Sequence, residues 1–386
     1  MKRISRIKVI LLPSLIAFIL FISCEKKEET IEIPLTKEQL DSIRKADIEK
    51  EIAEHDTFPQ INYTQVVIRD KAHLQEIFNK IKNPNTEFPN LKVLATLNRK
   101  ELRFFAVGQT IVVPDTIIEN MFAYSCFPQY YPGAKDLKKI IMVSNKYQAY
   151  ACYEYGELVR FSASNTGKER TQTYPGRYAL EWKEAVHRSS LDSEWVMPFN
   201  FNFHSEAGSA FHQFMMPGRP VSHSCCRQFM DDAKWLFYWG EGFKKDEKGK
   251  KIPLSGTPVV LIDHFDFART KGGPWLDLKS NKDSILSLPE DPMAVEEALI
   301  PMCQIPEGSR GSLRNRQRYV HAEDTLRERG IIRPGVKLIV TVNYNVLRRQ
   351  KELKEIKARE AKLKEAQKKK EAELLHEGTN SNSTPK

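Results

Sequence analysis

The sequence predicts a large, mainly β domain, with a small α/β domain before it and a long helix after it. Short apolar or alternating runs at 139–144, 147–153 and 158–164 are separated by polar turns, as in antiparallel strands. A helical pattern at 72–81, followed by Asn and Pro residues, indicates a separate small domain nearer the N-terminus. A stretch rich in Lys, Glu and Ala at 345–377 predicts a single long helix with only a weak apolar stripe.

Length and charge limit the possible functions. The 386 residues are enough for two or three domains, and an apolar content of 41% is ordinary for a globular protein. The net charge is +10, and residues 346–386 hold 12 Lys or Arg against 7 Asp or Glu, so they supply +5 of it. This basic segment suits anionic envelope polymers or lipid head groups. No nucleic-acid motif accompanies it, so we expect no nucleic-acid partner.

Residues 1–23 predict a signal peptide, because basic residues precede a short apolar run at 9–22. The run ends in Phe-Ile-Ser-Cys at Cys24, which resembles a bacterial lipobox and implies a lipid anchor on that cysteine. An uncleaved signal anchor is the alternative. No Asp stands beside Cys24, which favours a periplasm-facing lipoprotein of the cell envelope, at the outer rather than the inner membrane.

A charged tether at 24–56, with a helix beginning at Thr36, leads to the small domain at 57–118. In that domain an apolar helix ends at Asn98, and a strand at 107–114 reads Val-Gly-Gln-Thr-Ile-Val-Val-Pro. This order resembles the second half of a LysM-type module. The resemblance implies a LysM-like α/β domain that binds glycan strands of peptidoglycan; the alternative is a helper domain that only packs on the catalytic one.

The candidate chemistry lies between His212 and Cys225, which stand thirteen positions apart. The loop between them contains Pro217, Gly218 and Pro220, so it must turn sharply and cannot continue as a helix or a central strand. Such a loop can bring a thiol and an imidazole base together. Nucleophilic cysteine chemistry needs these two groups and backbone N–H groups facing a developing oxyanion.

The block that follows, Ser-His-Ser-Cys-Cys-Arg at 222–227, resembles the Ser-His-Gly-Cys-Val-Arg signature of L,D-transpeptidases with a YkuD-type catalytic domain. Other motifs of that family occur in the same order around it, at 164–167, 173–180, 232–236 and 256–261. The resemblance implies a catalytic domain at 119–267 with a β-sandwich fold and short helices. An aromatic segment at 194–203 is expected to line the approach to the site.

The resemblance also implies a role for each residue of the block. Cys225 is the expected nucleophile, and His212 is the base and proton donor. The N–H groups of Cys225 and Ser224 are the expected oxyanion donors. Oxyanion stabilisation and loop shaping are assigned to Ser222, His223, Ser224 and Arg227, of which the arginine fixes the turn or meets a substrate carboxylate. The chain departs from the pattern where Ser224 replaces Gly and where Cys226 doubles the cysteine.

The implied activity is a two-step acyl transfer without a metal or organic cofactor. The thiolate attacks the carbonyl of the third residue of a peptidoglycan tetrapeptide stem and releases D-alanine. The amine of a second stem then resolves the acyl-enzyme and forms a 3→3 cross-link. Water as acceptor would give an L,D-carboxypeptidase, and a protein amine would give protein-to-wall attachment. A non-catalytic peptidoglycan-binding lipoprotein is the alternative outside enzymes.

Several points stay open. His204 is a competing base, and a papain-like peptidase is disfavoured because its histidine normally follows its cysteine. Cys126 and Cys152 could pair in an exported protein. The extension at 268–344 has no assigned role, although 336–342 predicts a strand. The final segment, 345–386, is expected to be the charged helix and then a disordered tail from 378 onward.

Overall fold

The computed structural model describes residues 36–81, 90–270, 272–283 and 286–380. The expected signal peptide, the lipidation site at Cys24 and the beginning of the tether lie outside these residues. Contacts divide the chain into two compact units, Met1–Ala46 and Asp47–Lys386. Helix α1 (Lys37–His55) crosses that boundary and confirms the helix predicted to begin at Thr36. The Thr36 hydroxyl and the Gln39 side-chain amide each accept the other residue's backbone N–H and so cap its first turn. None of the described helices has the length and apolar character needed to span a bilayer.

The predicted mainly β fold is confirmed by two sheets in the larger unit. The first has the strand order β5-β4-β3-β11-β6 and is antiparallel except where β11 runs parallel to β3. Its strands are β3 (Ile140–Ser144), β4 (Ala149–Glu154), β5 (Glu157–Ala163), β6 (Gly176–Ala179) and β11 (Pro258–Leu261). The central strand β3 is buried along its whole length, which explains its uninterrupted apolar sequence.

The second sheet has the order β10-β9-β8-β7 and carries the candidate site. Its strands are β7 (Lys183–Arg188), β8 (Val196–His204), β9 (Ser209–Gln213) and β10 (Cys226–Gln228). Strand β10 runs parallel to β9, so the loop between them must return the chain to the same end of the sheet. Helix α4 (Met230–Trp239) follows β10 directly and contacts β8 and β9.

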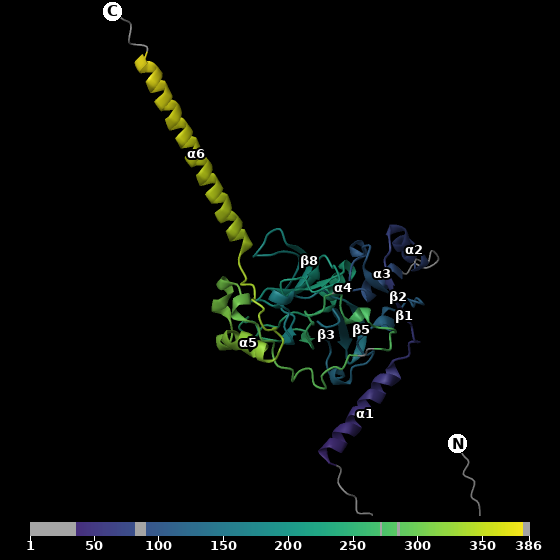
Figure 1. Cartoon of the computed structure of the whole chain (residues 1–386). Coiled ribbons are helices and arrows are strands. Elements are labelled where there is room, and N and C mark those ends of the chain that lie inside the picture. The colour runs from purple at the N-terminus through teal and green to yellow at the C-terminus, as the bar shows by residue number, and fades with distance from the viewer. Residues whose placement is uncertain (1–35, 82–89, 271, 284–285, 381–386) are drawn as a thin grey trace, which may run out of the picture. The chain divides into compact units, whose positions relative to one another are not determined.

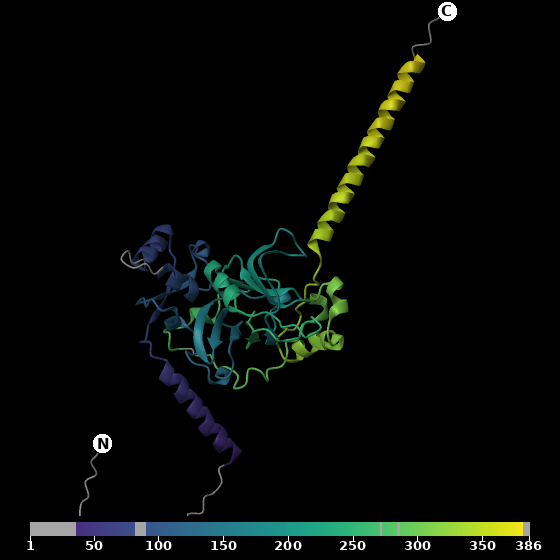
Figure 2. The same cartoon turned by 180° about the vertical axis from the view of Figure 1, so that it is seen from behind.

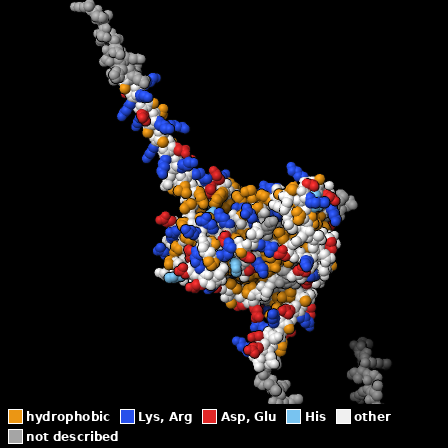
Figure 3. All heavy atoms as spheres, viewed as in Figure 1, with side chains coloured by type: hydrophobic (Ala, Val, Ile, Leu, Met, Phe, Trp, Pro, Cys, Tyr) orange, Lys and Arg blue, Asp and Glu red, His pale blue; other side chains and the backbone are white. Residues whose placement is uncertain are grey.

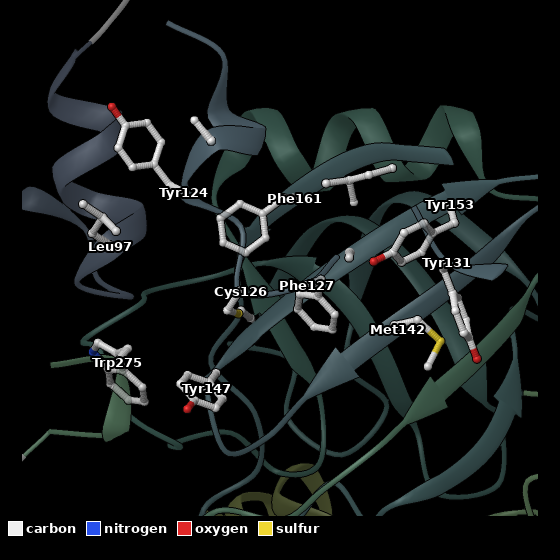
Figure 4. Close-up of a cluster of buried hydrophobic side chains, with 14 of the residues drawn as sticks. Leu97, Tyr124, Cys126, Phe127, Tyr131, Met142, Tyr147, Tyr153, Phe161 and Trp275 are labelled. Carbon is white, nitrogen blue, oxygen red and sulfur yellow. The ribbon is translucent and has the colours of Figure 1, made fainter. Parts of the chain in front are cut away.

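Two hydrophobic clusters cover opposite faces of the first sheet. Alternate residues of its strands, such as Val143 and Cys152, join Phe211 and Cys226 of the second sheet in one cluster, which makes the pair of sheets sandwich-like. The other face packs in the cluster shown in Figure 4, which contains Cys126. Cys126 and Cys152 are both free thiols and belong to different clusters, so the pairing considered from the sequence does not form.

The small domain has the element order β1 (Tyr63–Val67), α2 (Lys71–Ile81), α3 (Asn90–Leu97) and β2 (Thr110–Pro114), with the two strands antiparallel (Figures 1 and 2). The predicted helices and the second strand are present, whereas β1 was not predicted. Helix α3 is followed directly by Asn98, whose side-chain amide donates to the carbonyls of Leu94 and Val112 at 2.9 and 2.8 Å. This buried side chain thereby joins the end of the helix to β2.

The extension after the second sheet differs from the prediction. The expected strand at 336–342 is wrong: this segment is extended but forms no ladder. Its backbone N–H groups at Ile339 and Thr341 donate to single carbonyls, of Arg170 and of Cys303, in separate parts of the chain. Helix α5 (Arg316–Glu328) was not predicted and packs Ala322 and Leu326 into the cluster between the sheets. Short 3₁₀ helices complete the described chain: η1 (Leu102–Phe104), η2 (Met121–Tyr124), η3 (Pro132–Ala134), η4 (Glu169–Thr171), η5 (Pro274–Leu276), η6 (Met302–Gln304) and η7 (Glu307–Ser312).

The predicted C-terminal helix is present as α6 (Tyr344–Asn380). Its side chains are exposed from Arg349 to Lys370, and Lys and Arg side chains are prominent along it in the space-filling view (Figure 3). The helix therefore includes the first residues of the expected disordered tail, and residues 381–386 lie outside the described chain.

Candidate active site

Strand register decides which of the neighbouring cysteines faces the site. In the parallel pair of β9 and β10, Cys226 lies opposite Phe211 and Arg227 lies opposite His212. Side chains alternate between the two faces of a sheet, so His212, Arg227 and Cys225 share one face, while Cys226 shares the other with Phe211. Cys226 is completely buried in the cluster between the sheets, whereas Cys225 borders a cavity.

That cavity has a volume of about 500 Å³ and is bordered by both His212 and Cys225. Its wall also includes Lys168, from the loop between β5 and β6 of the first sheet, and Trp195, from the loop before β8. A residue of the C-terminal helix, Tyr344, contributes to the same wall. The structure therefore brings the two expected catalytic side chains to one cavity and surrounds them with residues from distant parts of the sequence.

His212 is a buried imidazole whose orientation is set by a backbone carbonyl. Its Nδ1 lies 3.0 Å from the carbonyl oxygen of Gln213. A carbonyl can only accept, so Nδ1 carries the proton in this bond and Nε2 is the ring atom that can take up another. Burial lowers the pKa of His212 to about 4. The ring is therefore neutral at pH 7 and able to act as a base.

The thiol of Cys225 is buried as well. Its Sγ lies 3.6 Å from the carbonyl oxygen of Gly208. Burial raises the pKa of Cys225 above its ordinary value, although the N–H of Ala210 and the charge of Arg227 oppose this shift. Because the thiol pKa is raised and the imidazole pKa is lowered, the resting pair is a neutral thiol and a neutral imidazole. Proton transfer then has to accompany nucleophilic attack.

Ser224 adopts the backbone conformation in which glycine is favoured. Its φ angle is +71°, so the side chain that replaces Gly is held in the left-handed region. The hydroxyl groups of Ser224 and Ser209 lie 2.7 Å apart and share a hydrogen bond. The backbone N–H of Ser224 donates to the carbonyl of Thr171 at 3.1 Å. This donor is therefore occupied in the structure, and it would have to leave the Thr171 carbonyl to stabilise an oxyanion.

Ser222 holds the loop that carries the cysteine. Its hydroxyl donates to the carbonyl of Cys225 at 2.6 Å, and its backbone N–H donates to the carbonyl of Thr166 at 3.0 Å. His223 instead lies in the cavity wall, with its ring centroid 5.6 Å from that of Trp195. Burial, with the charges of Lys168 and Arg227, lowers the pKa of His223 to about 4. The Nε2 atom of this ring is buried and has no hydrogen-bond partner in the described part of the chain.

Arg227 both stabilises the turn and borders the cavity. One guanidinium N–H donates to the carbonyl of Met215 at 3.1 Å, and the group lies 4.6 Å above the Phe214 ring. Its backbone pairs with Asn165 through two hydrogen bonds. Neither Lys168 nor Arg227 forms an ion pair with a carboxylate of the described residues. The cavity therefore presents positive charge that a bound anion could neutralise.

His204, the competing base, lies elsewhere. Its Nε2 is 3.1 Å from the Tyr319 hydroxyl, and its ring packs edge-on against Tyr178. His204 is not among the residues that border the cavity with Cys225, so the geometry favours His212 over it as the base. Among the described residues, no group of three or more His, Cys, Asp or Glu side chains could hold a metal ion.

Residues 138–261 match the family described as YkuD, the L,D-transpeptidase catalytic domain. This segment is therefore similar to the YkuD family. The match extends from the start of the first sheet to the end of β11 and includes every residue of the 222–227 block. No curated protein matches the chain.

Similar solved structures include an L,D-transpeptidase from Mycobacterium smegmatis, with 15% identity and a TM-score of 0.27 over 33% of this chain. Another comes from Xylanimonas cellulosilytica, with 25% identity and a TM-score of 0.25 over 32% of this chain. In both cases the match spans 59% of the other chain. An L,D-transpeptidase from Stackebrandtia nassauensis is 16% identical, with a TM-score of 0.29 over 57% of this chain and 90% of its own.

Some residues that border the cavity belong to no sequence motif and could not be predicted from the sequence. Tyr344 and Lys168 belong to no recognisable pattern, whereas Trp195 lies in the aromatic segment at 194–203 that was predicted to line the approach to the site. The loop between His212 and Cys225 also packs against the small domain, where the Glu101 N–H donates to the carbonyl of Met216 at 2.9 Å. A side chain at Gly218, where φ is +83°, would come within 3.0 Å of Lys100 Cβ, so glycine is required there.

Proposed function

We propose that this protein is a peptidoglycan L,D-transpeptidase that uses Cys225 as its nucleophile. The observation that carries the proposal is the placement of His212 and Cys225 on one face of adjacent parallel strands, bordering one cavity, within a YkuD domain. The substrate is a tetrapeptide stem, attacked at the L-centre carbonyl of its third residue, usually meso-diaminopimelate. The acceptor is the side-chain amine of a second stem, and the product is a 3→3 cross-link.

In the first step, the Cys225 sulfur forms a bond to the carbonyl carbon while the thiol proton moves to Nε2 of His212. The resulting imidazolium is a strong acid, because burial disfavours its charge. It returns the proton to the nitrogen of the departing D-alanine as the C–N bond breaks. The stem is then held as a thioester on Cys225.

In the second step, a neutral amine of another stem attacks the thioester carbonyl. His212 accepts a proton from the attacking nitrogen, the C–S bond breaks, and the proton returns to the sulfur. The N–H of Cys225 is the proposed oxyanion donor from the signature block, since that of Ser224 is occupied by Thr171. The hydrogen bond from Ser222 to the Cys225 carbonyl keeps the neighbouring peptide in place.

The surroundings of the thiol favour an anionic peptide as the acyl donor. Lys168 and Arg227 border the cavity without carboxylate partners among the described residues, so they attract the carboxylates of a stem peptide. The small domain, with its LysM-like sequence, would bind glycan strands and hold the enzyme against its polymeric substrate. A lipid on Cys24 would anchor the protein at the periplasmic face of the outer membrane.

The test uses the full chain in detergent and purified tetrapeptide muropeptides, with products identified by mass. We expect cross-linked dimers and free D-alanine from the wild type and from Cys226→Ala, and neither product from Cys225→Ala. Shortened monomers without dimers would indicate a carboxypeptidase. No reaction by folded wild-type protein that still binds the muropeptide would support the non-catalytic alternative and contradict the proposal.

A further inference from the structure

We propose that the C-terminal part of the chain completes the substrate cavity and that Tyr344 is a positioning and specificity residue of the site. We call residues 331–348 the strap. The strap lies after the YkuD match, which ends at residue 261, yet it supplies Tyr344 to the cavity that contains Cys225. The identity of the ligand, an anionic stem peptide, rests on the proposed function; the placement of the strap does not.

Three rings form an aromatic wall in this cavity. The Tyr344 ring lies 5.6 Å from Trp195 and 6.4 Å from His223, and Trp195 and His223 are 5.6 Å apart. All three residues border the cavity, and the rings come from the strap, the loop between β7 and β8, and the signature block. Ring pairs at these distances and inclined angles pack favourably and present rigid surfaces to a ligand.

The wall contains a polar atom that still lacks a partner. Nε2 of His223 is buried and forms no hydrogen bond with any residue that the structure describes. A buried nitrogen without a partner is costly, and a bound ligand that supplies a hydrogen bond would remove that cost. The aromatic faces suit the flat peptide groups and aliphatic side chain of a stem peptide, and Lys168 and Arg227 suit its carboxylates.

One side of the strap is tied to the loop between β7 and β8. The Asn345 N–H donates to the carbonyl of Leu191 at 3.0 Å, and its side-chain amide donates to the carbonyl of Ser190 at 3.1 Å. The same amide accepts the N–H of Ser193 at 2.9 Å. The three hydrogen bonds hold the loop that carries Trp195 against the beginning of α6.

An ion pair strengthens this attachment. The guanidinium of Arg348 hydrogen-bonds to the buried carboxylate of Asp192 and lies 3.3 Å from the carboxylate of Glu194. The bond from Arg348 lowers the pKa of Asp192, so its carboxylate stays charged. The neighbouring Arg349 is exposed on the same helix, which makes it a matched control.

The strap is also tied to the opposite wall. The Ile339 N–H donates to the carbonyl of Arg170 at 3.0 Å, and the Arg170 guanidinium returns a bond of 2.7 Å to the carbonyl of Lys337. Arg170 lies two residues after Lys168, in the segment that borders the cavity. The strap therefore connects the loop between β5 and β6 of the first sheet with the loop between β7 and β8 of the second, and removing its contacts would loosen the two walls of the site.

The test compares Tyr344→Ala with Tyr344→Phe, and Arg348→Ala with Arg349→Ala, in the full chain acting on tetrapeptide muropeptides. We expect Tyr344→Ala to raise KM by roughly tenfold, because the variant loses the apolar area and ring contacts of the wall. Tyr344→Phe keeps the ring and should keep the wild-type KM. Arg348→Ala should raise KM severalfold, and Arg349→Ala should not. Alkylation of Cys225 by iodoacetamide and the thermal unfolding midpoint report separately on the thiol and the fold.

An unchanged KM in Tyr344→Ala would overturn the proposal. So would a Tyr344→Ala variant whose loss of activity is explained by unfolding, seen as a lower thermal unfolding midpoint together with altered alkylation of Cys225. The proposed function fails separately. One outcome is that the wild type forms no product while Cys225→Ala still binds the muropeptide with an affinity that depends on Tyr344. That result would support the role of the aromatic wall in binding and contradict the assignment as an enzyme. If all Tyr344 variants cross-link like the wild type, the enzymatic assignment is supported and the role of the aromatic wall is contradicted.

Discussion

Because His212 is neutral in the folded protein, the free energy of unfolding should depend on pH in a measurable way. In the folded protein its pKa is about 4, against an ordinary value of 6.5 that the unfolded chain regains. Between these values the unfolded chain binds more protons than the folded one, so stability falls as the pH falls from 6.5 towards 4. The loss from this residue alone is about 2 kcal/mol at pH 5 and about 3 kcal/mol at pH 4, relative to pH 7.

The assay is urea unfolding of the wild type and of His212→Asn, followed by tryptophan fluorescence, at pH 7, 6 and 5. Asparagine does not titrate, so the wild type should lose about 2 kcal/mol more than the variant between pH 7 and 5. The buried rings of His204 and His223 are common to both proteins and cancel in the difference. Equal pH dependence would mean that the folded protein tolerates a charged His212, and the neutral thiol–imidazole pair would be the wrong resting state.

Two further predictions concern the signature loop. Cys226→Ser places a hydroxyl in an apolar cluster and should lower the free energy of unfolding by roughly 1–3 kcal/mol while Cys225 alkylation keeps its rate; slower alkylation would contradict the separation of the two thiols. Ser224→Ala should cost about 1 kcal/mol through the lost hydrogen bond to Ser209, whereas Ser224→Gly should be less destabilising because it also relieves the left-handed strain. If Ser224→Ala were the more stable of the two in urea unfolding, the strain argument would be wrong.

Local sequence signals were sufficient for the regular elements with the clearest patterns, but not for β1 or α5. The apolar run that became β3 is buried on both faces, and the stretch rich in Lys, Glu and Ala became α6. Such elements depend on periodicity and propensity, which are properties of neighbouring residues. The prediction failed for 336–342, whose apolar and β-branched residues resemble a strand. The chain beside that segment, at Arg170 and Cys303, is not a β-strand, so the segment forms isolated hydrogen bonds instead of a β-ladder.

The candidate site was predictable only in part. The spacing of His212 and Cys225 across a loop bent by proline pointed to their meeting, and the motif order pointed to the YkuD family. The motif could not show that the Ser224 N–H would be occupied by Thr171, because that bond joins positions 53 residues apart. For the same reason it did not reveal Tyr344, which reaches the cavity from the other end of the chain.

The sequence by itself determined the kinds of chemistry available to this protein: a thiol and an imidazole at a fixed spacing, a bent loop between them, and β strands to support them. Only the tertiary structure decided which cysteine meets the cavity. The parallel register of β9 and β10 turns Cys225 towards His212 and Cys226 towards the core. The physical reason is that side chains alternate along a strand, so a shift of one residue exchanges the buried face for the functional one.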